Sequence, residues 1–150
     1  MKTGDKTLGI IGCGNMGSAL AEFLQRKFGS HQIYIFDKEG AKEKDLVKKG
    51  FANGCNSLEE LISKSHVIIL AVKPQDIAPA LAEIREEIKD KLIISIAAGV
   101  KTRTISDTLL VPVRLVRAMP NTPALVLSGA TALFIGEGCT KEDEKAALKI

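Results

Sequence analysis

"LGIIGCGNMGSALAEFL", residues 8–24, begins as a short apolar run, continues through three glycines and ends as an amphipathic stretch. Gly12, Gly14 and Gly17 have the G-x-G-x-x-G spacing that follows a strand and opens a helix in dinucleotide-binding proteins. Gly12 would permit a tight turn, Gly14 would let the backbone approach a pyrophosphate, and Gly17 would let the helix pack closely on the strand. We therefore expect the first strand, loop and helix of a dinucleotide-binding fold.

The start of this expected helix is the predicted phosphate site. The first amides of a helix have no partner within it, and the helix dipole makes this end positive. Backbone amides around Asn15 and Met16 would therefore hold the pyrophosphate of a bound dinucleotide.

Asp37 is the predicted contact for the adenosine ribose. It ends the second apolar run, 20 residues after Gly17, where a carboxylate can accept hydrogen bonds from ribose hydroxyls. This position favours an unmodified 2′-hydroxyl. Lys38 and Lys42 follow at once and could instead contact a 2′-phosphate, or they could be solvated helix charges. The preference between NAD and NADP, each in its reduced form, therefore stays open.

Short apolar runs alternate with longer amphipathic stretches along the rest of the chain. Several runs are apolar at nearly every position, which is typical of parallel strands covered on both faces. Repeated strand–helix–strand units predict an α/β fold with a doubly wound, mostly parallel Rossmann-type sheet and helices on both faces. Strands are expected at Leu8–Ile11, Ile33–Phe36, Val67–Val72, Leu92–Ala97, Val113–Val116 and Ala130–Ile135, with a further short strand before Asn56.

Two of the amphipathic stretches carry specific helix signals. Ser57 and Glu60 have the spacing of a capping box, in which each side chain satisfies the other residue's amide. Residues 76–89 place four apolar residues on one helical stripe. These residues are Ile77, Leu81, Ile84 and Ile88.

Three segments follow strand ends that should line a cleft. In doubly wound sheets, ligands bind beyond the carboxyl ends of the strands, near the point where strand order reverses. The first segment is Ala71-Val72-Lys73-Pro74, in which the proline forces Lys73 into an extended conformation. The second is Ala97-Ala98-Gly99, whose small residues leave room for a flat ring. The third is Met119-Pro-Asn-Thr-Pro123, whose two prolines make a rigid turn that could aim Asn121 and Thr122 into the cleft.

Composition limits the function classes. The 150 residues suffice for one core, and 45% hydrophobic with 26% charged residues is typical of a globular protein. Basic and acidic residues alternate, and only 4% of residues are aromatic, with no Trp, so we expect no nucleic-acid partner. No apolar run approaches the roughly 18 residues of a membrane span, so no membrane partner is expected either.

The cysteines indicate the compartment. Cys13, Cys55 and Cys139 are odd in number and lack metal-binding spacings, so we expect free thiols, no metal site and a cytoplasmic location.

Four segments together resemble pyrroline-5-carboxylate reductase, in order and with matching spacing over essentially the whole chain. They are LGIIGCGNMG at residues 8–17, AVKPQ at 71–75, SIAAGV at 95–100 and RAMPNTPALV at 117–126. The glycine loop is shared with many dehydrogenases, whereas AVKP together with RAMPNTPA is specific. The resemblance implies an oxidoreductase of proline biosynthesis. Its reaction would transfer hydride from a reduced nicotinamide to the C=N carbon of 1-pyrroline-5-carboxylate, giving L-proline.

The resemblance also implies a set of site residues. Positions matching residues 11–16, Asn56 and residues 71–74 hold the dinucleotide in this family, and those matching residues 97–99 and Asn121 lie beside the nicotinamide. No catalytic residue is identified. Together with the residues chosen above, the candidate cofactor-binding set is Ile11, Gly12, Cys13, Gly14, Asn15, Met16, Gly17, Asp37, Lys38, Asn56, Ala71, Val72, Lys73, Pro74, Ala97, Ala98, Gly99 and Asn121.

The end of the chain carries an expectation about domains. Thr140 is a plausible N-cap for a short final helix. Members of the family continue into a helical C-terminal domain that supplies the dimer interface and most of the substrate-carboxylate pocket. We therefore expect residues 1–138 to be the dinucleotide-binding domain and residues 139–150 to begin a helix or a connection to that second domain. Alone, the chain should be weakly active or inactive, and it should form a homo-oligomer only with the second domain.

Two other functions stay open. One is a hydroxyacid dehydrogenase with the same G-x-G-x-M-G start, although that group lacks MPNTP after the sixth strand. The other is a dinucleotide-binding module without chemistry of its own.

Overall fold

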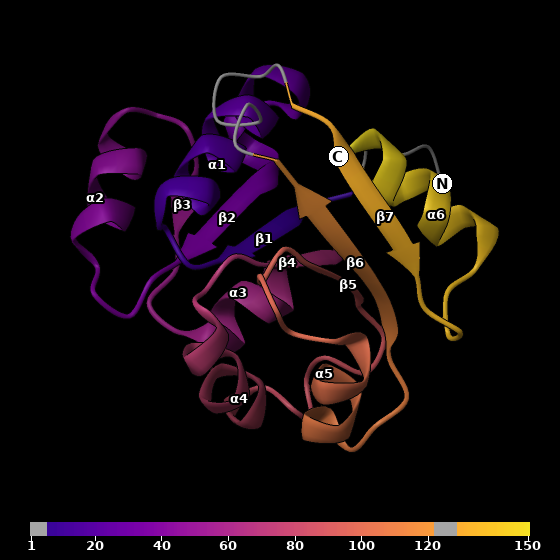
Figure 1. Cartoon of the computed structure of the whole chain (residues 1–150). Helices are drawn as coiled ribbons and strands as arrows, with labels where there is room; N and C mark the ends of the chain where they lie inside the picture. The colour runs from indigo at the N-terminus through magenta and orange to yellow at the C-terminus, as the bar shows by residue number, and fades with distance from the viewer. Residues whose placement is uncertain (1–5, 122–128) are drawn as a thin grey trace.

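The computed structural model describes residues 6–121 and 129–150, which form one seven-stranded sheet with helices on both faces (Figure 1). The strand order is β3-β2-β1-β4-β5-β6-β7, and it reverses between β1 and β4. All neighbours are parallel except β6 and β7, so the predicted doubly wound, mostly parallel fold is confirmed. The strands are β1 (Leu8–Ile11), β2 (Ile33–Phe36), β3 (Asn53–Gly54), β4 (Val67–Leu70), β5 (Leu92–Ser95), β6 (Arg114–Pro120) and β7 (Thr131–Ile135).

The helices divide between the two faces, and each face has its own core. Leu24, Leu46 and Ala146 belong to one apolar cluster, whereas Leu61 and Leu81 belong to the other. The first cluster packs beneath α1 (Asn15–Phe28), α2 (Ala41–Lys48) and α6 (Lys141–Lys149). The second packs beneath α3 (Leu58–Lys64), α4 (Pro74–Glu83) and α5 (Thr102–Leu109), which lie below the sheet in Figure 1. A short 3-10 helix, η2 (Ser30–Gln32), precedes β2. None of the described helices is long and apolar enough to cross a membrane.

Successive side chains of each short strand point to opposite faces of the sheet, so one strand contributes to both cores. In β4, Ile69 packs into the cluster under α1, and its neighbours Ile68 and Leu70 pack into the cluster under α3 and α4. All four residues of β4 are buried. Each such side chain contributes roughly 1.5–3 kcal/mol by leaving water, so continuous apolar runs specify a central strand covered on both sides.

The ends of three strands differ from the prediction. β4 and β5 each end two residues early, because their neighbours toward the middle of the sheet also leave it there. β6 continues four residues beyond Val116, through Pro120, because β7 pairs with it antiparallel, with Pro120 opposite Thr131. Proline is tolerated at this position because β5 pairs with β6 only as far as Arg117, so Pro120 lies at a free edge of the sheet on that side.

The helix signals are confirmed in part. The Ser57 hydroxyl accepts from the Glu60 amide at 3.2 Å, as predicted, but the Glu60 carboxylate accepts from the amide of Asn56 at 2.7 Å and not from that of Ser57. The four residues of the predicted stripe in 76–89 are all buried, yet α4 ends at Glu83 and residues 84–90 form turns. At the last helix, Thr140 is an N-cap as expected and forms a complete capping box with Asp143.

Asp143 also fastens α6 to the sheet. Its side chain is 1% exposed and accepts from Nη1 of Arg114, on β6, at 2.8 Å. Nη2 of the same arginine donates to the carbonyl of Asp90 at 2.6 Å, in the turn that leads to β5. A buried carboxylate is stable only when its charge is paired and hydrogen-bonded, and both conditions hold here.

The three cysteines are free thiols, as predicted, and two of them are buried. Burial, and then the charge of Asp37, raises the pKa of Cys13 to about 12. Burial, and then the charge of Glu60, raises the pKa of Cys55 to about 11. Neither thiol is therefore a nucleophile near neutral pH.

We predict that Asp143→Ala lowers the free energy of unfolding by about 2–3 kcal/mol. The change removes the carboxylate that accepts from the Thr140 amide in the capping box, and it leaves the half-buried Arg114 without its partner. Urea unfolding at neutral pH measures the loss. Asp45→Ala is the control, because it breaks the exposed Asp45–Lys49 pair and should shift stability by no more than about 0.5 kcal/mol. Equal losses in the two variants would contradict the anchoring role of Asp143.

The raised thiol pKa values predict a loss of stability at alkaline pH. The unfolded thiol ionises near pH ~8.5, whereas the folded Cys13 thiol keeps its proton until about 12. The stabilising contribution is therefore complete below the unfolded pKa and is lost as pH rises toward the folded one. Unfolding measured across this range should give a shallower pH dependence for Cys13→Ser than for the wild type, and parallel curves would refute the assignment.

Candidate functional site

The glycine loop between β1 and α1 has the geometry that its spacing predicts. Gly12 adopts φ 99°, and a methyl carbon there would lie 2.8 Å from the carbonyl oxygen of Ala71. A methyl carbon on Gly17 would overlap the carbonyl oxygen of Gly12, so only glycine lets α1 approach the loop. A methyl carbon on Gly14, in contrast, would have no atom of the described residues within 4 Å apart from its chain neighbours. The loop is thus tightly packed on the protein side and open at Gly14.

The N-terminus of α1 is available to an anion. Its N-cap, Gly14, has no side chain to accept from the first amides, and the first turn of this described helix contains no acidic residue. Ser18 closes the loop from inside the helix, because its hydroxyl donates to the carbonyl of Cys13 at 2.9 Å. The amides at Asn15 and Met16 therefore remain for a phosphate, as the residues of a pyrophosphate site should.

Asp37 holds the loop from the end of β2. Its Oδ2 accepts from the backbone amide of Cys13 at 2.6 Å, and its Oδ1 accepts from the amide of Glu39 at 2.9 Å. The amide of Asp37 itself donates to the Glu43 carboxylate at 3.0 Å. Burial, and secondarily the Asp37 charge, raises the pKa of Glu43. Asp37 is thus a structural brace as well as a candidate ribose contact.

A cleft of about 450 Å³ opens beside this loop. Gly12 and Gly14 lie at its base, residues 36–39 and Lys42 form one wall, and residues between 71 and 83 form the other. The cleft lies at the carboxyl ends of β1 and β4, where the strand order reverses. Its size falls in the range of small-molecule sites, roughly 300–1,000 Å³. The predicted residues that it brings together are Ile11, Gly12, Gly14, Asp37, Lys38, Ala71, Val72 and Lys73.

Two lysines of the cleft have definite surroundings. Nζ of Lys38 donates to Oδ1 of Asp76, in the first turn of α4, at 2.6 Å. This hydrogen bond is the first cause that raises the pKa of Lys38. Lys73 is extended, as the sequence predicts, and it is the N-cap of α4, which begins at Pro74, two residues before the predicted helix. Lys42 is exposed.

Other predicted residues occupy places that sequence could not specify. Cys13 is fully buried and its amide donates to Asp37, so it supports the loop and does not line the cleft. Asn56 is missing from the described residues that line the cleft, and its side chain donates to Glu60 at 3.1 Å. Its contact with a cofactor stays a prediction.

The predicted cleft segments after β5 and β6 are described in part. Ala97 is buried, and Ala98 and Gly99 are exposed after β5. Oδ1 of Asn121 accepts from the amide of Ala130 at 3.0 Å, so this side chain closes the connection between β6 and β7. Thr122, the other residue expected to face the cleft, lies outside the described residues, as does Pro123.

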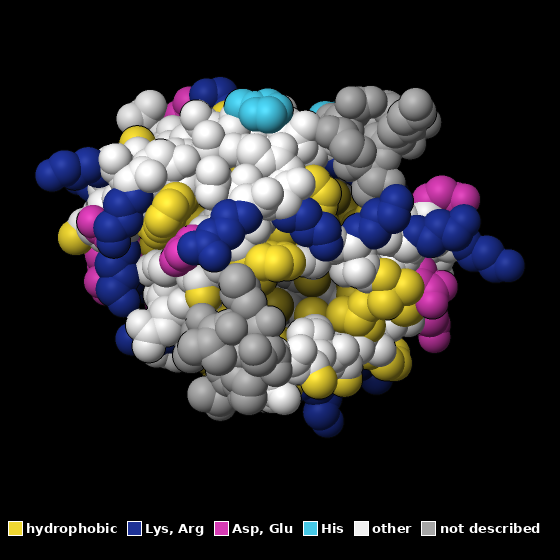
Figure 2. Space-filling view, turned by 90° about the horizontal axis from the view of Figure 1, so that it is seen from above, with side chains coloured by type: hydrophobic (Ala, Val, Ile, Leu, Met, Phe, Trp, Pro, Cys, Tyr) yellow, Lys and Arg dark blue, Asp and Glu magenta, His cyan; other side chains and the backbone are white. Residues whose placement is uncertain are grey.

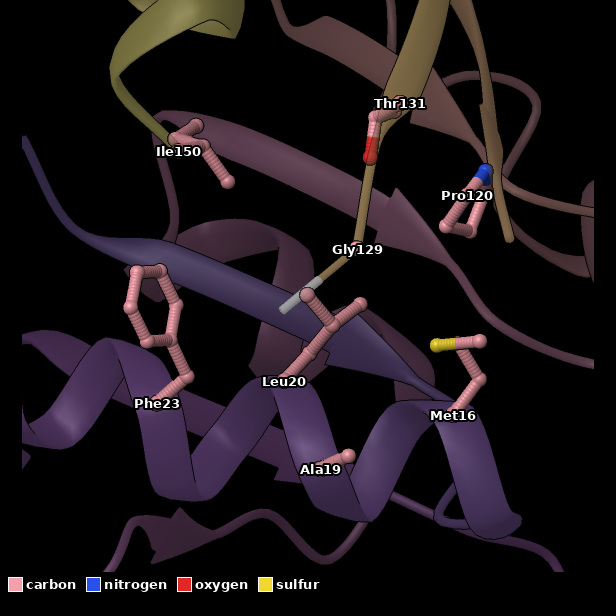
Figure 3. Close-up of a pocket in the computed structure, with 8 residues that line it drawn as sticks. All are labelled: Met16, Ala19, Leu20, Phe23, Pro120, Gly129, Thr131 and Ile150. Carbon is pink, nitrogen blue, oxygen red and sulfur yellow. The ribbon is translucent and has the colours of Figure 1, made fainter. Parts of the chain in front are cut away.

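An apolar hollow of about 240 Å³ lies on the α1 face of the sheet, and no sequence pattern predicts it. Met16, Leu20 and Phe23 project into it from α1, opposite Pro120 of β6 and Ile150 (Figure 3). Figure 2 shows apolar side chains around a hollow on one face of the molecule. Met16 thus has its amide at the predicted phosphate site and its side chain in this hollow. The members are far apart in sequence, which is why periodicity does not reveal the hollow.

Known proteins with similar sequences identify the family of this chain. Residues 7–99 match the family model described as NADP oxidoreductase, coenzyme F420-dependent. The pyrroline-5-carboxylate reductase of Methanosarcina acetivorans is 39% identical over 97% of this chain and 55% of its own length, and that of Escherichia coli is 36% identical with the same coverage. The resemblance found in the sequence is thus confirmed.

Solved structures of pyrroline-5-carboxylate reductases have the same fold as this chain. A pyrroline-5-carboxylate reductase from Coxiella burnetii superposes with a TM-score of 0.88 and 30% identity, over 95% of this chain and 54% of that one. The Plasmodium falciparum enzyme, solved with NADP bound, superposes with a TM-score of 0.84 and 28% identity, over 95% of this chain and 53% of that one. The chain therefore spans about half the length of the relatives that it matches. It belongs to the family described as NADP oxidoreductase, coenzyme F420-dependent, and is similar to the N-terminal part of pyrroline-5-carboxylate reductases.

Proposed function

We propose that this chain is the cofactor-binding part of an enzyme that reduces 1-pyrroline-5-carboxylate to L-proline with NADPH or NADH. The observation that carries the proposal is the glycine loop, which is closed by Gly12 and Gly17, open at Gly14, and placed at the base of a cleft where the strand order reverses. The names of the relatives supply the substrate, and the NADP of the Plasmodium falciparum structure supports the cofactor.

The proposed site would hold a dinucleotide in three parts. The amides at Asn15 and Met16 would bind the pyrophosphate, and the Asp37 carboxylate would accept from the adenosine ribose. The nicotinamide would lie near residues 97–99 and Asn121. A bound reduced nicotinamide supplies the hydride, so the role of the protein is to fix the position of the ring against the imine carbon.

We propose that the substrate site needs a second part of the enzyme. In support, the relatives are nearly twice as long as the matched region. Residues 1–138 would then be the dinucleotide-binding domain, residues 139–150 would lead into a helical domain, and that domain would supply the substrate-carboxylate pocket and the homo-oligomer interface.

The free thiols support a cytoplasmic location, and the mixed surface charges support small molecules as the only other partners.

The two glycines of the loop should respond differently to substitution. Gly14→Val should leave the fold intact, because its side chain enters open space, yet weaken dinucleotide binding at least about tenfold by keeping phosphate away from the amides. Gly17→Ala should lower the free energy of unfolding by about 1–3 kcal/mol, because it pushes α1 off the loop. Calorimetric titration with NADPH and NADH measures the first effect, and thermal unfolding measures the second. Wild-type affinity in Gly14→Val would refute the cofactor site.

The proposed reaction can be tested with a chimera. Residues 1–150 are joined to the complementary part of the Methanosarcina acetivorans relative, and oxidation of NADPH or NADH is followed with 1-pyrroline-5-carboxylate present. The chimera should be active, and the 150 residues alone should be at least about 100-fold slower because the imine is not held in place. Full activity of the 150 residues alone would contradict the need for a second part. A chimera that binds dinucleotide but ignores the imine would contradict the substrate.

A further inference from the structure

An ion pair joins the two walls of the cleft at its adenosine end. Lys38 directly follows Asp37 after β2, and Asp76 lies in the first turn of α4 on the opposite wall. Their charged atoms are 2.6 Å apart, with the lysine side chain 68% exposed and the aspartate side chain 27% exposed. The ammonium group is therefore directed toward α4 and away from the ribose contact at Asp37.

The Asp37 carboxylate is fixed beside that ion pair. Its two oxygens accept from the amides of Cys13 and Glu39, so the group cannot rotate away without leaving a loop amide unpaired. Each oxygen keeps a further lone pair for a ribose hydroxyl. A phosphate at the same place would meet a fixed negative charge, and Glu39 and Glu43 add two more carboxylates to this segment.

Few cations remain to offset these charges. The segment 37–43 contains two lysines, and Lys38 is already paired with Asp76. Lys42 is the other, in α2, and Lys73 at the start of α4 also lines the cleft; both are exposed, without an ion pair among the described residues. Lys38 directly follows Asp37, so its pairing with Asp76 engages the cation that is adjacent in sequence to the expected ribose contact.

We propose that this end of the cleft prefers a dinucleotide with an unmodified 2′-hydroxyl, and that the Lys38–Asp76 ion pair enforces the preference by withholding Lys38 from a 2′-phosphate. The inference rests on the proposed dinucleotide site and specifies which ligand that site takes. It also resolves the two roles that the sequence leaves open for Lys38, since the lysine is neither a phosphate ligand nor a freely solvated charge.

The test measures dissociation constants of the 150-residue chain for NADH and NADPH by calorimetric titration. The wild type should bind NADH about tenfold more tightly. Asp76→Asn releases Lys38 and should tighten NADPH binding about three- to tenfold, while NADH changes less than about twofold. Raising the ionic strength from about 0.05 M to about 0.5 M should reduce the gain. Glu86→Gln is the matched control, because it removes the same charge from an exposed pair with Lys89 on the residues after α4 and should not favour NADPH.

A double variant identifies the group responsible. Lys38→Met added to Asp76→Asn should return NADPH binding to the wild-type level, because the released ammonium is gone. Tighter binding of NADPH than NADH by the wild type would overturn the proposal, as would an equal gain for both dinucleotides in Asp76→Asn. Failure of the wild type to bind either dinucleotide would overturn the cofactor site itself, and the preference with it.

Discussion

The whole site depends on the absence of a side chain at Gly17. Helix α1 starts directly above the end of β1 only because nothing on this residue collides with the Gly12 carbonyl. That approach places the positive end of α1 at the edge where β1 and β4 diverge, and it leaves Gly14 facing the cleft. A side chain at Gly17 would tilt the helix away from the sheet and carry the amides of the proposed phosphate site with it.

Much of the fold can be predicted from local sequence because both faces of the sheet are buried. Val67 to Leu70 must be a central strand, since a continuous apolar run leaves no face for water. The extension of β6 through Pro120 cannot be predicted in this way, because it depends on pairing with β7. For the same reason, the Glu60 carboxylate binds the amide of Asn56 and not the predicted one: several donors compete at a helix end, and spacing alone does not choose among them.

The site shows the same division between local and distant information. The three glycines are readable because each one serves a geometric need of its own turn. The bond from the Cys13 amide to Asp37 joins residues 24 positions apart, and it follows from the pairing of β1 with β2. The contact of Lys38 with Asp76 spans 38 positions and depends on where α4 begins. Sequence therefore identifies the parts of the site, but not the hydrogen bonds and ion pairs that orient them.

The double duty of Asp37 restricts how this protein could evolve. The residue that would recognise the ribose is also the acceptor that keeps the glycine loop in shape. A lineage that exchanged it to accommodate another cofactor would weaken phosphate binding at the same time, unless a second change supplied a new acceptor for the Cys13 amide. Asp76 carries no such burden, because no backbone group of the loop depends on it. Drift in cofactor use should therefore begin on α4, and the β2 aspartate should change late or never.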